Sequence, residues 1–195
     1  MSRFLLPPVL WLLFVQAYGQ HTAFRLRTIR VEHGLSNNRV NCILQDQLGF
    51  TWVGTDDGLN RFDGNAFTVF QHEPGNKQSI GGNIIQDLCE DKDGRLWIAT
   101  GDGGLCRYDR YAEPSHRFKN FRHLPGDSNS IPVNTINAVL YDTSGKIWLA
   151  TSGAGIVQFD IIKEKFTRIN SPLRSTITDI SYDLSLIHIS QGIVR

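Results

Sequence analysis

The chain has 195 residues, of which 41% are hydrophobic and 20% charged, a composition typical of globular proteins that can bury a core. Its 20 basic and 19 acidic residues leave a formal net charge of +1, which gives no electrostatic reason to expect nucleic acid or an anionic membrane as a partner. The three cysteines are an odd number, which argues against a disulfide framework. We expect them to be small buried residues.

Residues 1–19 are expected to form a signal peptide. Arg3 supplies a short positive region, residues 4–15 are almost entirely apolar, and Ala17-Tyr18-Gly19 provides small residues at the spacing that a signal peptidase recognises. Cleavage is therefore expected before Gln20, which would make the protein an exported one. The apolar run is short for a membrane-spanning helix, which needs about 20 residues. An uncleaved anchor is the alternative.

The rest of the chain carries an internal repeat centred on three tryptophans that lie 45 and 51 residues apart. Each tryptophan has an aspartate six residues before it, a glycine three before it and a threonine three after it. These landmarks are Asp46, Gly49, Trp52 and Thr55 in the first unit, Asp91, Gly94, Trp97 and Thr100 in the second, and Asp142, Gly145, Trp148 and Thr151 in the third. Such a register, kept three times, indicates a repeat architecture.

In chain order, a lead-in segment at 20–39 precedes three units that each read as four short strands. The first strand of each unit, at 40–45, 85–90 and 136–141, ends at an Asp-x-x-Gly segment typical of a tight turn. The second strand carries the tryptophan, the third ends at an aromatic-Asp pair, and the fourth is expected at 66–70, 117–121 and 165–169. Units of this kind predict an all-β partial β-propeller, with antiparallel blades at 40–70, 84–121 and 135–169.

The tryptophans are predicted to lie in the blade cores. Two residues after each one stands a small residue, Gly54, Ala99 or Ala150, and a small residue beside a large one lets neighbouring blades stack face to face. The alternative, that the indoles form a sugar-binding platform, is the weaker interpretation.

The fourth unit breaks off. Residues 176–183 read as its first strand, because Ile177 and Asp183 match Val40 and Asp46. The register then requires glycine at 186 and tryptophan at 189, where the sequence has Leu186 and Ile189. We therefore expect residues 184–195 to lie off the repeat, as a truncation or sequence artifact. Three blades would also leave two blade faces uncovered, and so favour self-association.

Recognition is expected on the loops, because a rigid scaffold commonly presents binding residues in this way. Alternating strands place the turns between second and third strands on the same face as the linkers between units. Both linkers contain His-x-Pro-Gly. The repeated asparagines Asn38, Asn83 and Asn134 are interpreted as turn caps. Ligand candidates on this face are Asp56, Asp57, His72, Lys77, Asp102, His123, Asp127 and Ser152.

No motif for catalysis, a metal or a cofactor stands out. Asp91-Lys92-Asp93-Gly94 resembles the start of a calcium loop, but the downstream glutamate is missing and a turn is the simpler interpretation. Gly101-Asp102-Gly103-Gly104 is not followed by the Lys-Ser/Thr pair of a phosphate loop. Sequence alone leaves open a pair of carboxylates brought together from distant blades.

The segment from Gly34 to Val40, together with Gln45-Asp46 and the run from Gly49 to Gly64, closely resembles the opening blade of the two-component regulator propeller family. The segments 91–100 and 142–151 look like its later repeats. The resemblance implies the periplasmic sensor region of a hybrid histidine kinase, with an oligosaccharide or other small polar ligand. It further implies more blades, downstream membrane, kinase and receiver segments, and a homodimeric receptor. Alternatives are a propeller enzyme such as a polysaccharide lyase or glycosidase, the sensor of a diguanylate cyclase, and a protein-binding scaffold.

Overall fold

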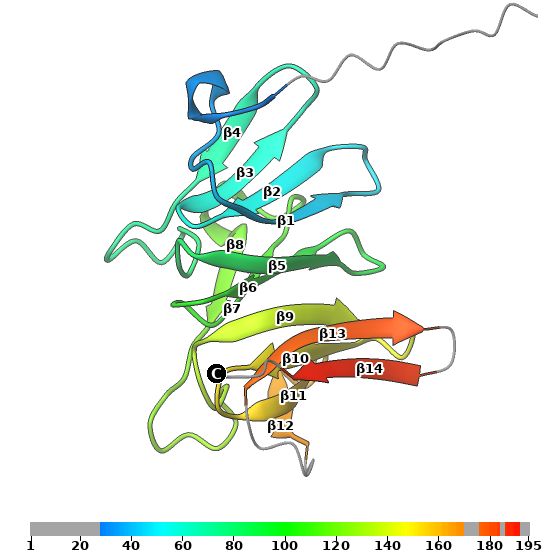
Figure 1. Ribbon diagram of the computed structural model, residues 1–195. Coiled ribbons are helices and arrows are strands. Elements are labelled where there is room, and N and C mark those ends of the chain that lie inside the picture. Colours follow the sequence, from blue (N-terminus) through cyan, green and yellow to red (C-terminus); the bar gives the residue numbers. More distant parts are fainter. Residues whose placement is uncertain (1–27, 170–175, 184–185, 192–195) are drawn as a thin grey trace, which may run out of the picture.

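The computed structural model describes residues 28–169, 176–183 and 186–191. The predicted signal peptide and residues 192–195 of the tail lie outside these ranges. Within them the chain forms three four-stranded antiparallel sheets and one two-stranded sheet. Figure 1 shows the sheets following one another from the blue end of the chain to the red end, as successive blades. The predicted fold class, an all-β partial propeller, is confirmed.

Each four-stranded sheet keeps its strands in chain order, so every connection within a blade is a hairpin. Blade 1 contains β1 (Val40–Gln45), β2 (Thr51–Thr55), β3 (Gly58–Phe62) and β4 (Phe67–Phe70). Blade 2 contains β5 (Ile85–Glu90), β6 (Leu96–Thr100), β7 (Leu105–Tyr108) and β8 (Phe118–Phe121). Blade 3 contains β9 (Ile136–Tyr141), β10 (Lys146–Thr151), β11 (Gly155–Asp160) and β12 (Lys165–Arg168). Two short 3-10 helices, which the repeat did not predict, are η1 (Val31–His33) and η2 (Pro114–His116).

The first turn of every blade is organised by its repeated aspartate. In blade 2, Oδ1 of Asp91 accepts the backbone N–H groups of Asp93 and Arg95, both at 3.0 Å. Its Oδ2 accepts the indole N–H of Trp97 at 2.8 Å. The same indole bond joins Trp52 to Asp46 at 2.8 Å and Trp148 to Asp142 at 2.6 Å. The aspartate therefore closes the turn and pairs a tryptophan N–H that would otherwise be buried unpaired, at a cost of about 1–3 kcal/mol.

The tryptophan of one blade packs on an aromatic residue of the next. The ring of Trp52 meets that of Tyr108 edge-on, with centroids 5.3 Å apart and planes at 60°. One blade later, Trp97 meets Phe159 at 5.6 Å and 61°. Such edge-to-face pairs contribute about 0.5–1.5 kcal/mol beyond the area they bury. The prediction that these two tryptophans belong to the packed core is confirmed, because both are fully buried.

Close stacking explains the small residue that follows each tryptophan. A Cβ built on Gly54 would lie 2.4 Å from Sγ of Cys42 and 2.6 Å from Cγ2 of Ile85, which belongs to the next blade. In blade 1, therefore, even the alanine found at the equivalent positions 99 and 150 would force a neighbour to move.

Polar contacts also cross between neighbouring blades. The side-chain amide of Asn41 donates to the carbonyl of Ile85 at 2.9 Å, and Gly58 N–H donates to the carbonyl of Asn83 at 2.7 Å. The Arg110 guanidinium, which is mostly buried, pairs with Asp46 of blade 1 at 2.9 Å and with Glu90 of its own blade at 3.1 Å. Blade 1 is thus completed by residues of blade 2 and of the linker that precedes it.

Part of the tail forms a strand. β14 (Leu186–Gln191) pairs antiparallel with β13 (Ile177–Asp183), so the fourth unit has two strands where the repeat predicted one. The assignment of residues 184–195 to a truncation or sequence artifact stays a prediction. The pairing differs from that of the other blades: Asp183 lies opposite Leu186, whereas the equivalent Asp46 lies within a turn that joins Gln45 to Thr51. A strand needs no particular residue at 186 or 189, since backbone pairing alone can hold it in a hairpin.

Candidate functional site

Two predicted ligand candidates, Asp56 and Ser152, support contacts between blades. Asp56 accepts a hydrogen bond from the amide of Asn41 at 2.8 Å and pairs with Arg39 at 3.2 Å. Ser152 bonds to the amide of Asn137, which in turn donates to the carbonyl of Ile177 at 2.6 Å. Both side chains hold an asparagine that reaches the first strand of the next blade, which gives each of them a structural role.

Three more candidates lie at turns. Asp102 is exposed, and its Oδ2 accepts the N–H of Asn83 at 3.3 Å. The half-buried Asp57 uses its backbone, with its N–H donating to Thr55 Oγ1 at 3.1 Å and its carbonyl accepting from Gln71. Asp127 accepts the N–H of Asn129 at 2.8 Å within a turn. The structure does not bring these three side chains together at one site.

The candidates His72 and His123 occupy the same place in two matching linkers. The first linker, residues 71–84, joins β4 to β5, and the second, residues 122–135, joins β8 to β9. Nδ1 of His72 contacts the carbonyl of Ile80 at 2.8 Å, and its backbone N–H donates to Asn83 at 2.7 Å. His123 repeats both bonds, with Ile131 at 2.9 Å and Asn134 at 2.7 Å. Each histidine therefore stabilises the conformation of its own linker.

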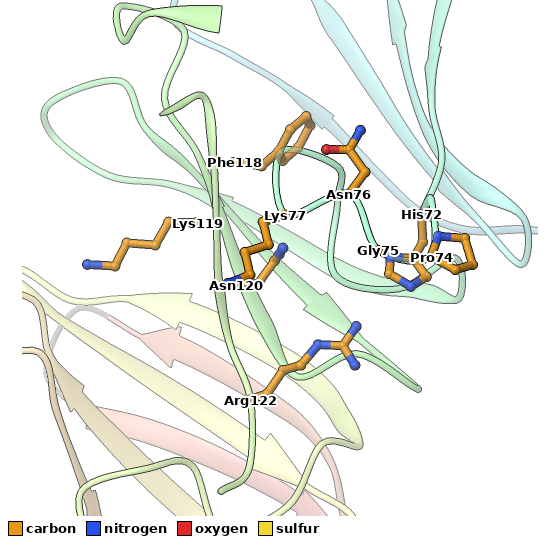
Figure 2. A pocket seen from close by; sticks show the side chains of 9 residues that line it. All are labelled: His72, Pro74, Gly75, Asn76, Lys77, Phe118, Lys119, Asn120 and Arg122. Atoms are coloured by element: carbon orange, nitrogen blue, oxygen red, sulfur yellow. The ribbon is translucent and has the colours of Figure 1, made fainter. Parts of the chain in front are cut away.

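A cleft of about 630 Å³ lies between the first linker and the outer strand of blade 2. We call it the linker cleft. Figure 2 shows the linker residues curving beside β8, which supplies the opposite wall. Its lining residues are His72, Pro74, Gly75, Asn76, Lys77, Phe118, Lys119, Asn120 and Arg122. Of the eight ligand candidates, it contains His72 and Lys77.

The charge of the linker cleft is positive. Lys77, Lys119 and Arg122 line it, and no aspartate or glutamate is among its lining residues. The Lys119 ammonium is paired with Glu164 of blade 3 at 2.5 Å, and Arg122 donates one hydrogen bond to the carbonyl of Gly81. Lys77 is exposed and makes no ion pair within the described residues. The cleft can therefore offer several N–H donors to a ligand.

One lining side chain has an unused acceptor. The amide of Asn120 donates through Nδ2 to the carbonyl of Ser79 at 3.0 Å, which attaches β8 to the first linker. Its Oδ1 is buried and has no hydrogen-bond partner. A buried acceptor without a partner costs about 1–3 kcal/mol.

Sequence reasoning missed the β8 wall, namely Phe118, Lys119, Asn120 and the adjacent Arg122. Repeat spacing identifies strands, and a residue on an outer strand is indistinguishable from an ordinary solvent-facing one. A usable signal existed in the comparison between units: β12 carries Thr167 and Arg168 where β8 carries Lys119 and Asn120.

Other chemistry is limited in the part of the chain that the structure describes. No group of three or more histidine, cysteine, aspartate or glutamate side chains is arranged there to hold a metal ion. None of the helices in the described ranges has the length and apolar character needed to traverse a bilayer.

Comparison with known proteins places the repeat in a family. Residues 34–57, 79–102 and 130–153 each match the family described as Two component regulator propeller. Each matched segment contains the first two strands of one blade, together with the turn that carries the paired aspartate and tryptophan.

The chain spans only a small part of the individual relatives that it matches. The chain is 38% identical to Histidine kinase P4 of Formosa agariphila over 68 residues. This match covers 35% of this chain and 5% of the kinase. The fold is similar to that of the extracellular domain of BT3049, which is assigned as a hybrid two component system of Bacteroides thetaiotaomicron. The TM-score is 0.73 and the sequence identity is 28%, and the match covers 84% of this chain and 23% of that one.

The extracellular domain of BT4673 from the same organism shares the fold, with a TM-score of 0.65 and 22% identity over 80% of this chain and 22% of that one. The chain thus spans under a quarter of these extracellular domains. Because a family match falls on each of the three blades, and the aspartate–tryptophan pairs of all three perform the same structural task, the three blades carry the repeat of the two-component regulator propeller family.

Proposed function

We propose that the chain is a ligand-sensing portion of a periplasmic receptor domain in a hybrid two-component system, with histidine kinase output elsewhere in the receptor. The observation that carries this proposal is the coincidence of three family matches with the three blades. The likeness to the extracellular domain of BT3049, at 28% identity, supports the same location and role. In this proposal the propeller detects the ligand, and other domains of the receptor produce the signal.

The ligand in this proposal is an oligosaccharide or a comparable small polar molecule. The linker cleft supports this idea, because its volume suits a few sugar rings and its lining combines N–H donors, amides and the apolar face of Phe118. The remaining partners are a second receptor copy and further blades. The further blades would cover the open faces of blade 1 and of the fourth unit. Nucleic acid has no place in this proposal.

The test uses the gene product at its full encoded length, in a strain that reports transcription from the adjacent operon. Saccharide mixtures from plant, algal and animal polysaccharides are supplied in turn, and binding to the purified protein is followed by calorimetry. The expected result is one saccharide class that both binds and raises the reporter signal. Turnover of a polysaccharide by the purified protein, without a reporter response, would show that the protein is an enzyme and not a sensor.

A further inference from the structure

The two linkers share one hydrogen-bonded framework. Besides the paired histidine bonds, Ser79 Oγ accepts the N–H of Glu73 at 3.0 Å and donates to the carbonyl of Asn76 at 2.9 Å. In the second linker Ser130 makes the same contacts with Leu124 at 3.0 Å and Asp127 at 2.9 Å. Both loops also have their glycine in the left-handed region, at φ +84° for Gly75 and +86° for Gly126. Their backbones are therefore built alike.

The residues displayed on this framework differ in charge. Asn76 and Lys77 of the first linker correspond to Asp127 and Ser128 of the second. On the facing outer strands, Lys119 of β8 corresponds to Thr167 of β12. Lys77 and Lys119 thus add two cations to the linker cleft, while Arg168 of β12 stands where β8 has Asn120, and Glu73 of the first linker stands where the second has Leu124. Asn76 and Asp127 make the same turn bond in the two linkers, and Lys119 pairs with Glu164. Lys77 makes no ion pair within the described residues, so a structural role does not account for its charge.

Lys77 is the cation best placed to act on a ligand. Lys119 is neutralised by Glu164, and Arg122 is held to the first linker through Gly81. Arg122 nevertheless keeps its charge and most of its five N–H donors. Beside these cations lie the unpaired Oδ1 of Asn120 and the ring of Phe118. A ligand with a negative group would match these cations, because they favour an oxyanion.

We propose that the linker cleft binds the negatively charged group of an acidic saccharide, a carboxylate or sulfate, with Lys77 and Arg122 as its donors. This inference rests on the proposed sensing function and specifies its ligand class. It places recognition at the perimeter of blade 2, between the first linker and β8, because the lining residues belong to these two segments.

The test measures binding of three galactose-based trisaccharides to the full-length gene product: one with uronate carboxylates, one with sulfate esters and one neutral. The two acidic probes separate carboxylate from sulfate recognition. We expect at least one acidic trisaccharide to bind more tightly than the neutral one, with an affinity that falls as salt is added. Lys77→Ser, which installs the residue of the second linker, is expected to weaken this binding about tenfold, as for loss of one charge-assisted hydrogen bond.

Lys92→Ser is the matched control, because Lys92 is exposed on the turn between β5 and β6 and the substitution removes the same charge outside the cleft. It should leave the affinity unchanged. Equal effects of the two substitutions, or equal binding of neutral and acidic probes, would overturn the acidic ligand and leave the sensor proposal standing. A protein that binds no saccharide and gives no reporter response would overturn both.

Discussion

The aspartate–tryptophan hydrogen bond that recurs in each blade could be predicted only in part from the sequence. The spacing of Asp91 and Trp97 predicted a tight turn and a buried ring, and both are present. It did not predict that the carboxylate and the indole bond to each other at 2.8 Å. The reason is that residue spacing indicates a turn, whereas the meeting of two side chains across it depends on rotamers that the pattern does not encode.

Removal of the Asp91 carboxylate should destabilise the protein strongly. Asp91→Ala leaves the buried indole N–H of Trp97 and two backbone N–H groups without their acceptor, so we expect a loss of about 3 kcal/mol in the free energy of unfolding. Urea titration followed by tryptophan fluorescence measures it. Asp93→Ala, which removes only a partly exposed ion pair with Arg95, should cost about 0–1 kcal/mol. Similar losses for both variants would refute the role given to Asp91.

The thiols should be unreactive in the folded protein. Burial raises the pKa of Cys42 and of Cys106 to about 12, with the nearby charge of Asp87 adding to the effect at Cys42. Because the thiolate is the reactive form, labelling by a disulfide reagent at pH 8 should be slower by about two to three orders of magnitude than in urea. Rapid labelling of the native protein would show that these cysteines are not buried as described.

The same thiols make stability depend on alkaline pH. The folded state keeps a proton that the unfolded chain releases above about pH 8.5, so the stabilisation is complete below that pH and is lost as pH rises towards 12. The urea midpoint should therefore fall between pH 8 and pH 11. In a Cys42→Ala/Cys106→Ala variant the urea midpoint should decrease less over this pH range. An unchanged decrease would show that other titrating groups cause it.

At the scale of elements, the strands were predictable and the linkers were not. The fourth strand of blade 2 was expected at 117–121 and is observed as β8 (Phe118–Phe121), because strand length and turn glycines are local properties. The linkers were recognised as long, polar and alike, and their histidines were interpreted as ligand candidates. In the structure Nδ1 of each histidine contacts a carbonyl eight residues on, a contact that depends on the path of the loop.

Asn83 should control the order of the first linker. Its Oδ1 accepts the N–H of His72, and its carbonyl accepts the N–H of Gly58. In Asn83→Ala the carbonyl bond remains and the side-chain bond is lost, so amide exchange at His72 should accelerate about tenfold, for a loss of about 1.5 kcal/mol. Exchange in β6 should stay unchanged and serves as the internal control. Acceleration throughout blade 2 would mean that Asn83 supports the whole sheet instead.

For the whole molecule, the repeat predicted an arc of blades, and it also predicts which surface is left uncovered. Ile43 of blade 1 is 67% exposed, whereas Leu88, at the equivalent place in blade 2, is 6% exposed beneath blade 1. Val40, Val53 and Phe67 line the same apolar depression of about 250 Å³. This face has the shape of a blade interface without a neighbouring blade.

The 195-residue chain on its own is expected to self-associate through this face, because contiguous exposed apolar surface favours association in water. Ile43→Lys should shift the chain towards monomer, as sedimentation velocity would show, with little change in unfolding midpoint at an exposed position. Ile162→Lys is a control, since Ile162 is 94% exposed in the turn between β11 and β12. A concentration-independent monomer for the unsubstituted chain would refute the expectation.

The contacts that the first linker and blade 2 make with blade 1 have a consequence for biosynthesis. Arg110, Asn83 and Ile85 supply partners to Asp46, Gly58 and Asn41, all of which are translated earlier. A nascent chain that has been synthesised only as far as β4 still lacks those partners, so its blade 1 remains incomplete. During export, chaperones would therefore have to shield the newly translocated sheet of blade 1 until the residues that follow it arrive. A pause in translation after blade 1 would lengthen the time during which this sheet is incomplete.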